Sequence, residues 1–139
     1  MAGYSGTPLA KKLGVREGAN LLLVNSPQEM EQWLAPLPDR VQVKVLPDRG
    51  KARDQDVIVF FPKDEKELTR RFGALARGLR PSGGLWVAWP KKASGVPTDL
   101  SDSVVRESGL SAGLVDNKVC AISEVWSGLR FVQRLKDRK

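Results

Sequence analysis

The chain has 139 residues, of which 41% are hydrophobic and 28% are charged, a composition typical of one folded globular domain. It contains no histidine and one cysteine, Cys120, which excludes histidine-based acid–base catalysis, histidine-ligated metals and an internal disulfide. The formal net charge is +7, but lysine and arginine are spread over the whole chain, so we expect a solvated basic surface and no specific nucleic-acid binding.

The first 46 residues predict a helix, a strand, a second helix and a second strand. Thr7, followed by a proline, begins a short helix that ends at Gly14. Asn20–Asn25 (NLLLVN) is an almost continuous apolar run, as in a strand buried on both faces of a parallel sheet. Ser26–Glu29 (SPQE) combines a capping box with proline at the first helical position, which predicts a helix start at Ser26. Val41–Leu46 (VQVKVL) alternates with a period of two, typical of an edge or half-exposed strand.

The middle of the chain predicts two more buried strands around a long amphipathic helix. Asp56–Phe61 (DVIVFF) and Gly84–Trp89 (GLWVAW) are the strands, and Pro90 ends the second because proline has no N–H for the ladder. Asp64 caps the helix between them, with Glu67 three residues later. The helix ends before RPSGG, and its buried stripe consists of Leu68, Phe72, Leu75 and Leu79.

The remaining residues predict a fourth helix and a closing antiparallel hairpin. The helix is capped by Thr98, Asp99 or Ser101 and ends at Gly109. Two strand-like runs follow, NKVCAI and LRFVQR, joined by the turn SEVWSG. Trp126 falls in that turn, and we expect it to fold back over the core.

Strands that alternate with helices in this way predict the fold class. We expect an α/β, doubly wound, Rossmann-like three-layer sandwich whose mostly parallel sheet is closed by the antiparallel C-terminal hairpin. No repeat, low-complexity linker or boundary interrupts the chain, so residues 1–139 are expected to form a single domain. No stretch is apolar enough to span a membrane and the first residues lack an apolar signal core, so we expect a cytoplasmic protein.

In open α/β sheets, ligands bind beyond the carboxyl ends of the strands, which places a candidate site in the loops after three predicted strands. Lysines and helix starts in these loops favour binding of an anion such as phosphate or carboxylate. The alternative is that these loops bind no ligand and that their lysines only face solvent. No carboxylate pair or metal-ligand cluster is evident, so the sequence argues against catalysis, and we expect no cofactor and no metal. The candidate ligand-binding residues are Asn25, Ser26, Lys63, Lys91, Lys92, Ser94, Gly95 and Thr98.

Several segments resemble a known bacterial family. GGLWVAWPKKASGVPTDL, GLVDNKVCA, EVWSGLRFV and, near the N-terminus, GYSGTPLAKKLG are similar to the domain of unknown function 3052 family. The resemblance covers almost the whole chain and implies a compact cytoplasmic single domain, without pointing to an activity.

The order of elements also resembles a truncated Rossmann-like methyltransferase, in which a parallel sheet likewise ends in an antiparallel hairpin. One strand–helix unit of that fold would be missing here and bridged by Pro47–Gln55. Methyltransferases follow their first strand with a glycine-rich loop, whereas NSPQEM has no glycine; Asp48 is a poor substitute for the acidic residue that holds the ribose.

Two functions therefore stay open. The first is a module that binds an anionic small molecule or a protein partner without catalysis. The second is an enzyme of methyltransferase descent with an altered nucleotide or adenosylmethionine pocket. A tight helix start at Ser26 with Trp33 packed inward would leave no room for a nucleoside, whereas an open cleft above Asn25 and Pro62 would favour the second function.

Overall fold

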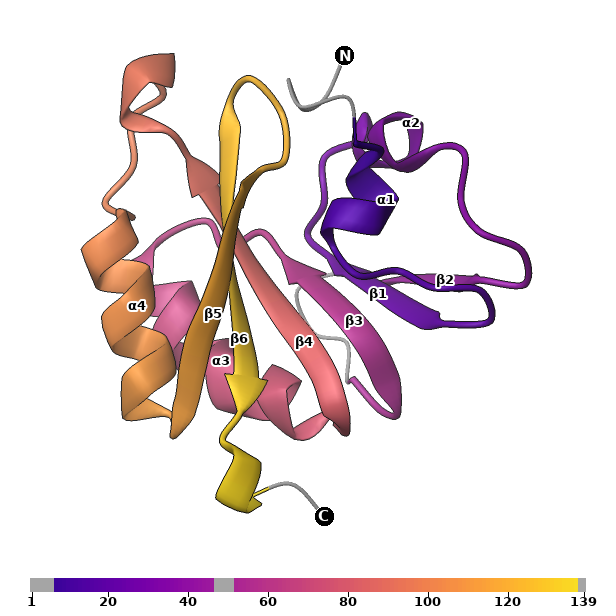
Figure 1. Ribbon diagram of the computed structural model, residues 1–139. Coiled ribbons are helices and arrows are strands. Elements are labelled where there is room, and N and C mark those ends of the chain that lie inside the picture. The colour runs from indigo at the N-terminus through magenta and orange to yellow at the C-terminus, as the bar shows by residue number, and fades with distance from the viewer. Residues whose placement is uncertain (1–6, 47–51, 138–139) are drawn as a thin grey trace.

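A computed structural model describes residues 7–46 and 52–137 of the chain. Within them, the strands form one six-stranded sheet in the order β2-β1-β3-β4-β6-β5 (Figure 1). The parallel pairs are β1 with β2, β1 with β3 and β3 with β4, while β6 runs antiparallel to both β4 and β5. The strand bounds are β1 Asn20–Val24, β2 Gln42–Leu46, β3 Gln55–Phe60, β4 Leu79–Pro90, β5 Leu114–Ala121 and β6 Trp126–Gln133.

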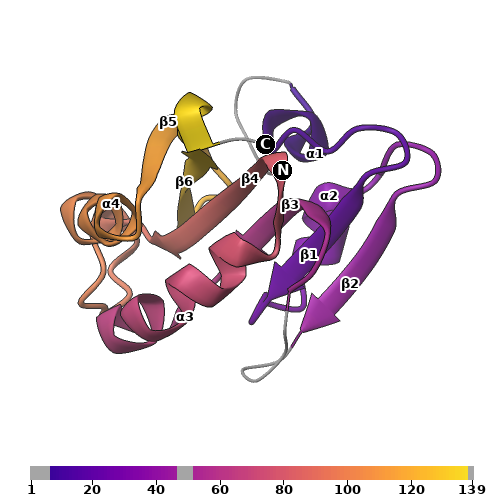
Figure 2. The same ribbon diagram turned by 90° about the horizontal axis from the view of Figure 1, so that it is seen from below.

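Helices cover both faces of the sheet, but unequally. Residues of α1 (Leu9–Lys12) and α2 (Met30–Leu34) belong to one apolar core, and those of α3 (Glu65–Arg77) and α4 (Asp102–Ser111) to the other. Figure 2 shows α3 and α4 on one side of the sheet and α1 on the other. Because α1 and α2 have only four and five residues, they cover far less of their face than α3 and α4 cover of theirs. Two short 3-10 turns, η1 (Lys92–Ser94) and η2 (Leu135–Asp137), complete the elements.

The two tryptophans of β4 show how alternation divides the core. Trp86 belongs to the α1 face and Trp89 to the α3 face, as expected for two strand residues three positions apart. Trp86 is fully buried, and its indole N–H donates to the Leu13 carbonyl at 3.0 Å, so it attaches the end of α1 to the sheet. The predicted α/β sandwich, with its parallel sheet and antiparallel hairpin, is confirmed.

The predicted helix start at Ser26 is wrong. The chain first makes a turn in which the Met30 N–H donates to the Pro27 carbonyl, and α2 begins only at Met30 with Glu29 at its N-cap. Burial explains the difference: Met30 and Leu34 are 0% and 2% exposed, and burying each contributes about 1.5–3 kcal/mol, more than the ~1 kcal/mol of a cap.

Three other predicted helix boundaries differ from those in the structure. Helix α1 has Pro8 at its N-cap and begins at Leu9, so Thr7 is not the capping residue. Leu79 begins β4 and is not part of the α3 stripe, because α3 ends at Arg77. Gly109 does not end α4; it lies within the helix, where an added Cβ would collide with the ring of Phe131.

Strand β2 is the edge that the alternating pattern predicts. It pairs only with β1, and Val43 and Val45 are 38% and 53% exposed, so its apolar side is not covered. Residues 47–51, including Asp48, lie outside the described residues. Among the helices that the structure describes, none is long and apolar enough to cross a membrane.

Candidate functional site

A cleft of about 430 Å³ opens at the carboxyl edge of the parallel strands. The register explains its position: Val24 of β1 lies opposite Phe60 of β3, which lies opposite Val87 of β4, so the three strands end close together. The loops that follow them supply most of the lining, which is Asn25, Phe61, Pro62, Lys63, Pro90, Val96, Pro97, Thr98 and Trp126.

The floor of the cleft is held by a buried carboxylate, Glu67, which is 3% exposed. Its Oε1 accepts from the Lys63 N–H at 2.8 Å, and both of its oxygens lie 3.2 Å from the Asn25 side-chain amide. The Arg70 guanidinium lies 3.6 Å from Oε2. Asn25 itself has φ +58°, a left-handed conformation that asparagine tolerates better than most residues. Glu67 thus joins the end of β1 to the β3–α3 loop.

The opposite wall is the loop between β4 and α4. Gly95 has φ +77° and allows the sharp turn after η1. The Ser94 hydroxyl donates to the Lys91 carbonyl at 2.6 Å and accepts from the Val96 N–H at 3.2 Å, which fixes the shape of the turn. Further along, the Asp99 carboxylate accepts from the Glu65 N–H at 3.0 Å and so ties the loop to the first turn of α3.

The first turn of α3 is less available to a ligand than the sequence suggests. Asp64 accepts from the Glu67 N–H at 2.8 Å, as the predicted cap requires, and Asp99 accepts from Glu65. Because protein carboxylates already occupy these donors, an anion in the cleft cannot use them. Helix α4 is capped in the same way by Ser101, whose hydroxyl accepts from the Val104 N–H.

An aromatic pair forms the apolar part of the cleft. The rings of Phe61 and Trp126 meet edge to face, with centroids 5.1 Å apart. Trp126 is the first residue of β6 and lies opposite Pro90, so the hairpin turn is shorter than predicted. The expectation that Trp126 folds back over the core is confirmed, because it is partly buried against the α1-face core.

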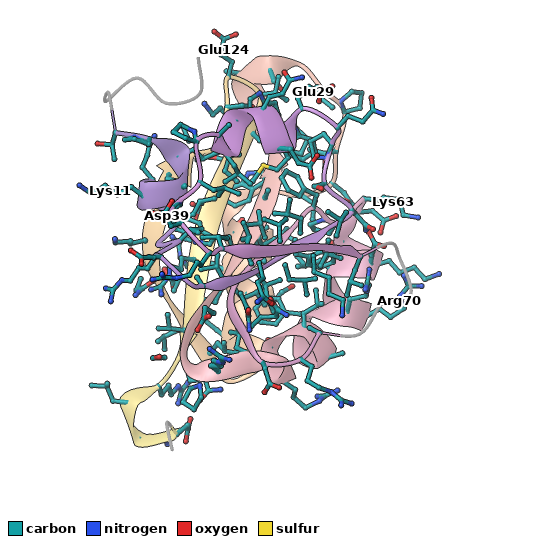
Figure 3. The ribbon with its side chains drawn as sticks, turned by 90° about the vertical axis from the view of Figure 1, so that its right-hand side faces the viewer. Lys11, Glu29, Asp39, Lys63, Arg70 and Glu124 are labelled. Atoms are coloured by element: carbon teal, nitrogen blue, oxygen red, sulfur yellow. The ribbon has the colours of Figure 1, made fainter. Side chains whose placement is uncertain are left out.

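The structure brings together part of the predicted site. Asn25, Lys63 and Thr98 line the cleft, and Ser26 follows directly after Asn25. Figure 3 shows the Lys63 side chain pointing away from the protein. The other predicted residues, Lys91, Lys92, Ser94 and Gly95, form the adjoining turn and do not themselves line the cleft.

Sequence reasoning missed Glu67 as the group that holds the floor, and Val96, Pro97 and Trp126 as lining residues. Glu67 carried a visible signal, since it is the third residue of a capped helix, but nothing in the pattern showed that its carboxylate is buried. The sequence Gly95-Val96-Pro97 was a weaker signal that this loop forms an apolar wall of the cleft.

The chemistry available in the described part of the chain is limited. No group of three or more histidine, cysteine or carboxylate side chains among these residues could hold a metal ion. Burial raises the pKa of the Cys120 thiol to about 11, although the charges of Lys12, Lys118 and Lys91 oppose the shift. The thiol is therefore protonated at neutral pH and is a poor nucleophile.

The fold is similar to that of several Rossmann-like methyltransferases of known structure. It is similar to a SAM-dependent methyltransferase from Aquifex aeolicus, with TM-score 0.60 and 13% identity over 88% of this chain and 86% of that one. It is also similar to DhpI in complex with SAH, with TM-score 0.64 and 12% identity over 92% of this chain and 83% of that one.

A protein described as a possible exported protein from Bordetella parapertussis gives TM-score 0.64 and 11% identity over 90% of this chain. The chain spans only 65% of that protein's length. Identities this low show the fold alone.

The family is shown by sequence. The family described as "Protein of unknown function (DUF3052)" matches residues 10–135, which is most of the chain, so the chain belongs to it. The resemblance found in the sequence is thereby confirmed. No curated protein matches the chain.

Proposed function

We propose that this protein is a Rossmann-like module that binds an anionic small molecule with an apolar part at the carboxyl edge of its sheet, without catalysing a reaction. The cleft carries this proposal. Its volume of about 430 Å³ lies within the ~300–1,000 Å³ of small-molecule sites, and such sites combine apolar walls with a few polar groups.

The lining suggests how such a molecule would lie. Its apolar part would pack against Phe61, Trp126 and the neighbouring prolines. Because Glu67 places a negative charge beneath Asn25, the anionic end is expected away from the floor, toward Lys63 and the turn that carries Lys91 and Lys92. Ser26, Ser94, Gly95 and Thr98 stay candidates for hydrogen bonds to the same group.

Thermal-shift and calorimetric screening with nucleotides, phosphorylated metabolites and aromatic carboxylates tests this proposal. A ligand present at 100 times its dissociation constant stabilises the folded state by about 2.7 kcal/mol. The double variant Lys91→Ala, Lys92→Ala and the single variant Lys63→Ala should fold normally and bind such a ligand more weakly. A matched control is Lys44→Ala, Lys66→Ala, which removes the same charge as the double variant at two exposed positions outside the cleft. If the cleft variants bind every ligand unchanged, this edge of the sheet is only a set of strand ends.

A second candidate function is an enzyme of methyltransferase descent, and one observation favours it. No helix starts at Ser26, and the cleft above Asn25 and Pro62 is open, as a nucleoside pocket requires. Trp33 nevertheless packs against the α1-face core, which is the part of the criterion that favours the first function. Against it, residues 26–29 contain no glycine that would let the backbone approach a cofactor. Calorimetry with adenosylmethionine and adenosylhomocysteine separates the two functions, because binding to either supports the second and no heat at millimolar concentration supports the first.

A further inference from the structure

A second and larger cavity, of about 570 Å³, lies on the α1 face of the sheet near the opposite, amino edge of the parallel strands. We call it the basic groove. Its floor and sides include Leu13, Ala19, Val57 and Gly83, at the end of α1 and the starts of β1, β3 and β4. The shortness of α1 explains the cavity. A four-residue helix cannot cover this face, and the chain leaves it through left-handed turns at Gly14 and Gly18, with φ +83° and +76°.

Positive charge dominates the groove. Its basic lining residues are Lys12, Arg16, Arg80, Lys118 and Arg130, which come from four different parts of the chain. They are far apart in sequence, so no basic run marks this site in the primary structure.

The acidic residues of the groove are already neutralised within the protein. Asp56 accepts from the Asn20 N–H at 2.8 Å and pairs with Arg80 at 3.3 Å. Glu17 pairs with Arg40. Among the described residues, no carboxylate lies within ion-pair distance of Lys12, Arg16 or Lys118. The groove therefore holds an excess of positive charge that its own carboxylates do not balance.

Strand register brings two of the cations together, and helix α1 adds a third. Lys118 of β5 lies opposite Arg130 of β6, which in turn lies opposite Trp86 of β4. The Arg130 guanidinium occupies the space where Gly84 lacks a side chain, so it lies close to the sheet. Lys12 approaches from α1, and its ammonium group donates to the Ala121 carbonyl of β5 at 3.4 Å.

The Cys120 thiol lies near two of these cations. The charges of Lys12 and Lys118, and of Lys91 outside the groove, lower its pKa against the effect of burial.

We propose that the basic groove is a binding site for a small molecule that carries a diphosphate or triphosphate group. Several convergent cations require a ligand with several negative charges, and guanidinium and ammonium groups bind phosphate oxygens through charge-assisted hydrogen bonds. The cations meet in one hollow and do not follow a stripe, which favours a compact ligand over a nucleic-acid strand. The volume is sufficient for a whole nucleotide.

Calorimetry with inorganic tripolyphosphate and with ATP at low salt tests the proposal on the full chain. The informative variant is Arg16→Ala, Lys118→Ala, because both side chains are exposed and neither is part of the apolar core. The control Lys44→Ala, Lys66→Ala removes the same charge outside the groove. We expect the groove variant to lose affinity about tenfold or more, and the control to stay within about twofold of the original protein.

Each outcome decides the matter. Equal weakening in the groove variant and the control would mean general attraction to a basic protein and would overturn the site, as would failure of the unchanged protein to bind either probe. Tighter binding of a single-stranded oligonucleotide than of ATP would overturn the small-molecule assignment. Tight tripolyphosphate binding with no gain from ATP would support the site and show that it recognises only the phosphate chain. The groove variant changes no residue of the cleft, and the cleft variant Lys63→Ala changes no residue of the groove, so failure of the cleft proposal and failure of this one are distinguishable.

Discussion

Removal of the Glu67 carboxylate is the sharpest test of how the cleft is built. In Glu67→Ala, the Lys63 N–H and the Asn25 side-chain amide both lose their charged acceptor. A hydrogen bond to a charged group contributes about 1.5–3 kcal/mol, and contributions of neighbouring bonds are not additive, so we expect a loss of about 2–4 kcal/mol in unfolding free energy. Urea denaturation followed by circular dichroism measures this loss.

Two further variants make the result specific. Glu65→Ala changes an exposed carboxylate two positions earlier in the same helix and should shift stability by no more than about 0.5 kcal/mol. Glu67→Gln keeps one carbonyl acceptor and should recover part of the loss. A loss below about 1 kcal/mol in Glu67→Ala would refute the argument, because it would mean that water replaces the carboxylate at no cost.

Three other changes test the core and the lone thiol. Leu75→Ala, at a side chain 1% exposed, should cost about 2–5 kcal/mol through lost burial and a cavity; a loss below about 1 kcal/mol in urea denaturation would contradict the packing of α3. Gly109→Ala should destabilise by about 1–3 kcal/mol because the new methyl group meets the Phe131 ring, although alanine usually stabilises a helix; a raised melting temperature would contradict this contact. The Cys120 thiol, with its pKa raised from 9.0 to about 11, should react with iodoacetamide at a rate that rises about tenfold per pH unit and levels only near pH 11, and a plateau near pH 9 would exclude the shift. Because the folded state keeps this proton longer than the unfolded chain, the corresponding stability is complete below pH 9.0 and is lost as the pH rises toward about 11.

The sheet could be predicted because its strands are marked by strong and redundant patterns. NLLLVN, DVIVFF and GLWVAW are apolar runs long enough to require burial on both faces, and Pro90 ends β4 where its missing N–H requires. Asp64 caps α3 as predicted from the sequence, and α4 is capped by Ser101, one of the three residues that the sequence offered. Ser26 carries an equally good capping pattern, yet no helix starts there, because a local preference of about 1 kcal/mol yields to the burial of Met30 and Leu34.

The candidate site was less predictable, for geometric reasons. The rule that ligands lie beyond the carboxyl ends of parallel strands located the cleft and three of its lining residues. It could not show that Trp126, from the hairpin far along the chain, would close one wall. The basic groove was invisible in the sequence, since Lys118 and Arg130 meet only through the pairing of β5 with β6.

The double attachment of α3 also gives the cleft a built-in reporter. Its floor is fixed through the Lys63 amide and its far wall through the Glu65 amide, and both protons are held by carboxylates, Glu67 and Asp99. Each proton exchanges with solvent when its own hydrogen bond breaks. A molecule that bridges floor and wall would slow deuterium uptake at both amides together, whereas one that touches a single side would slow only one. Deuterium uptake at these two backbone amides thus shows which sides of the cleft a ligand contacts, without any label in the cleft.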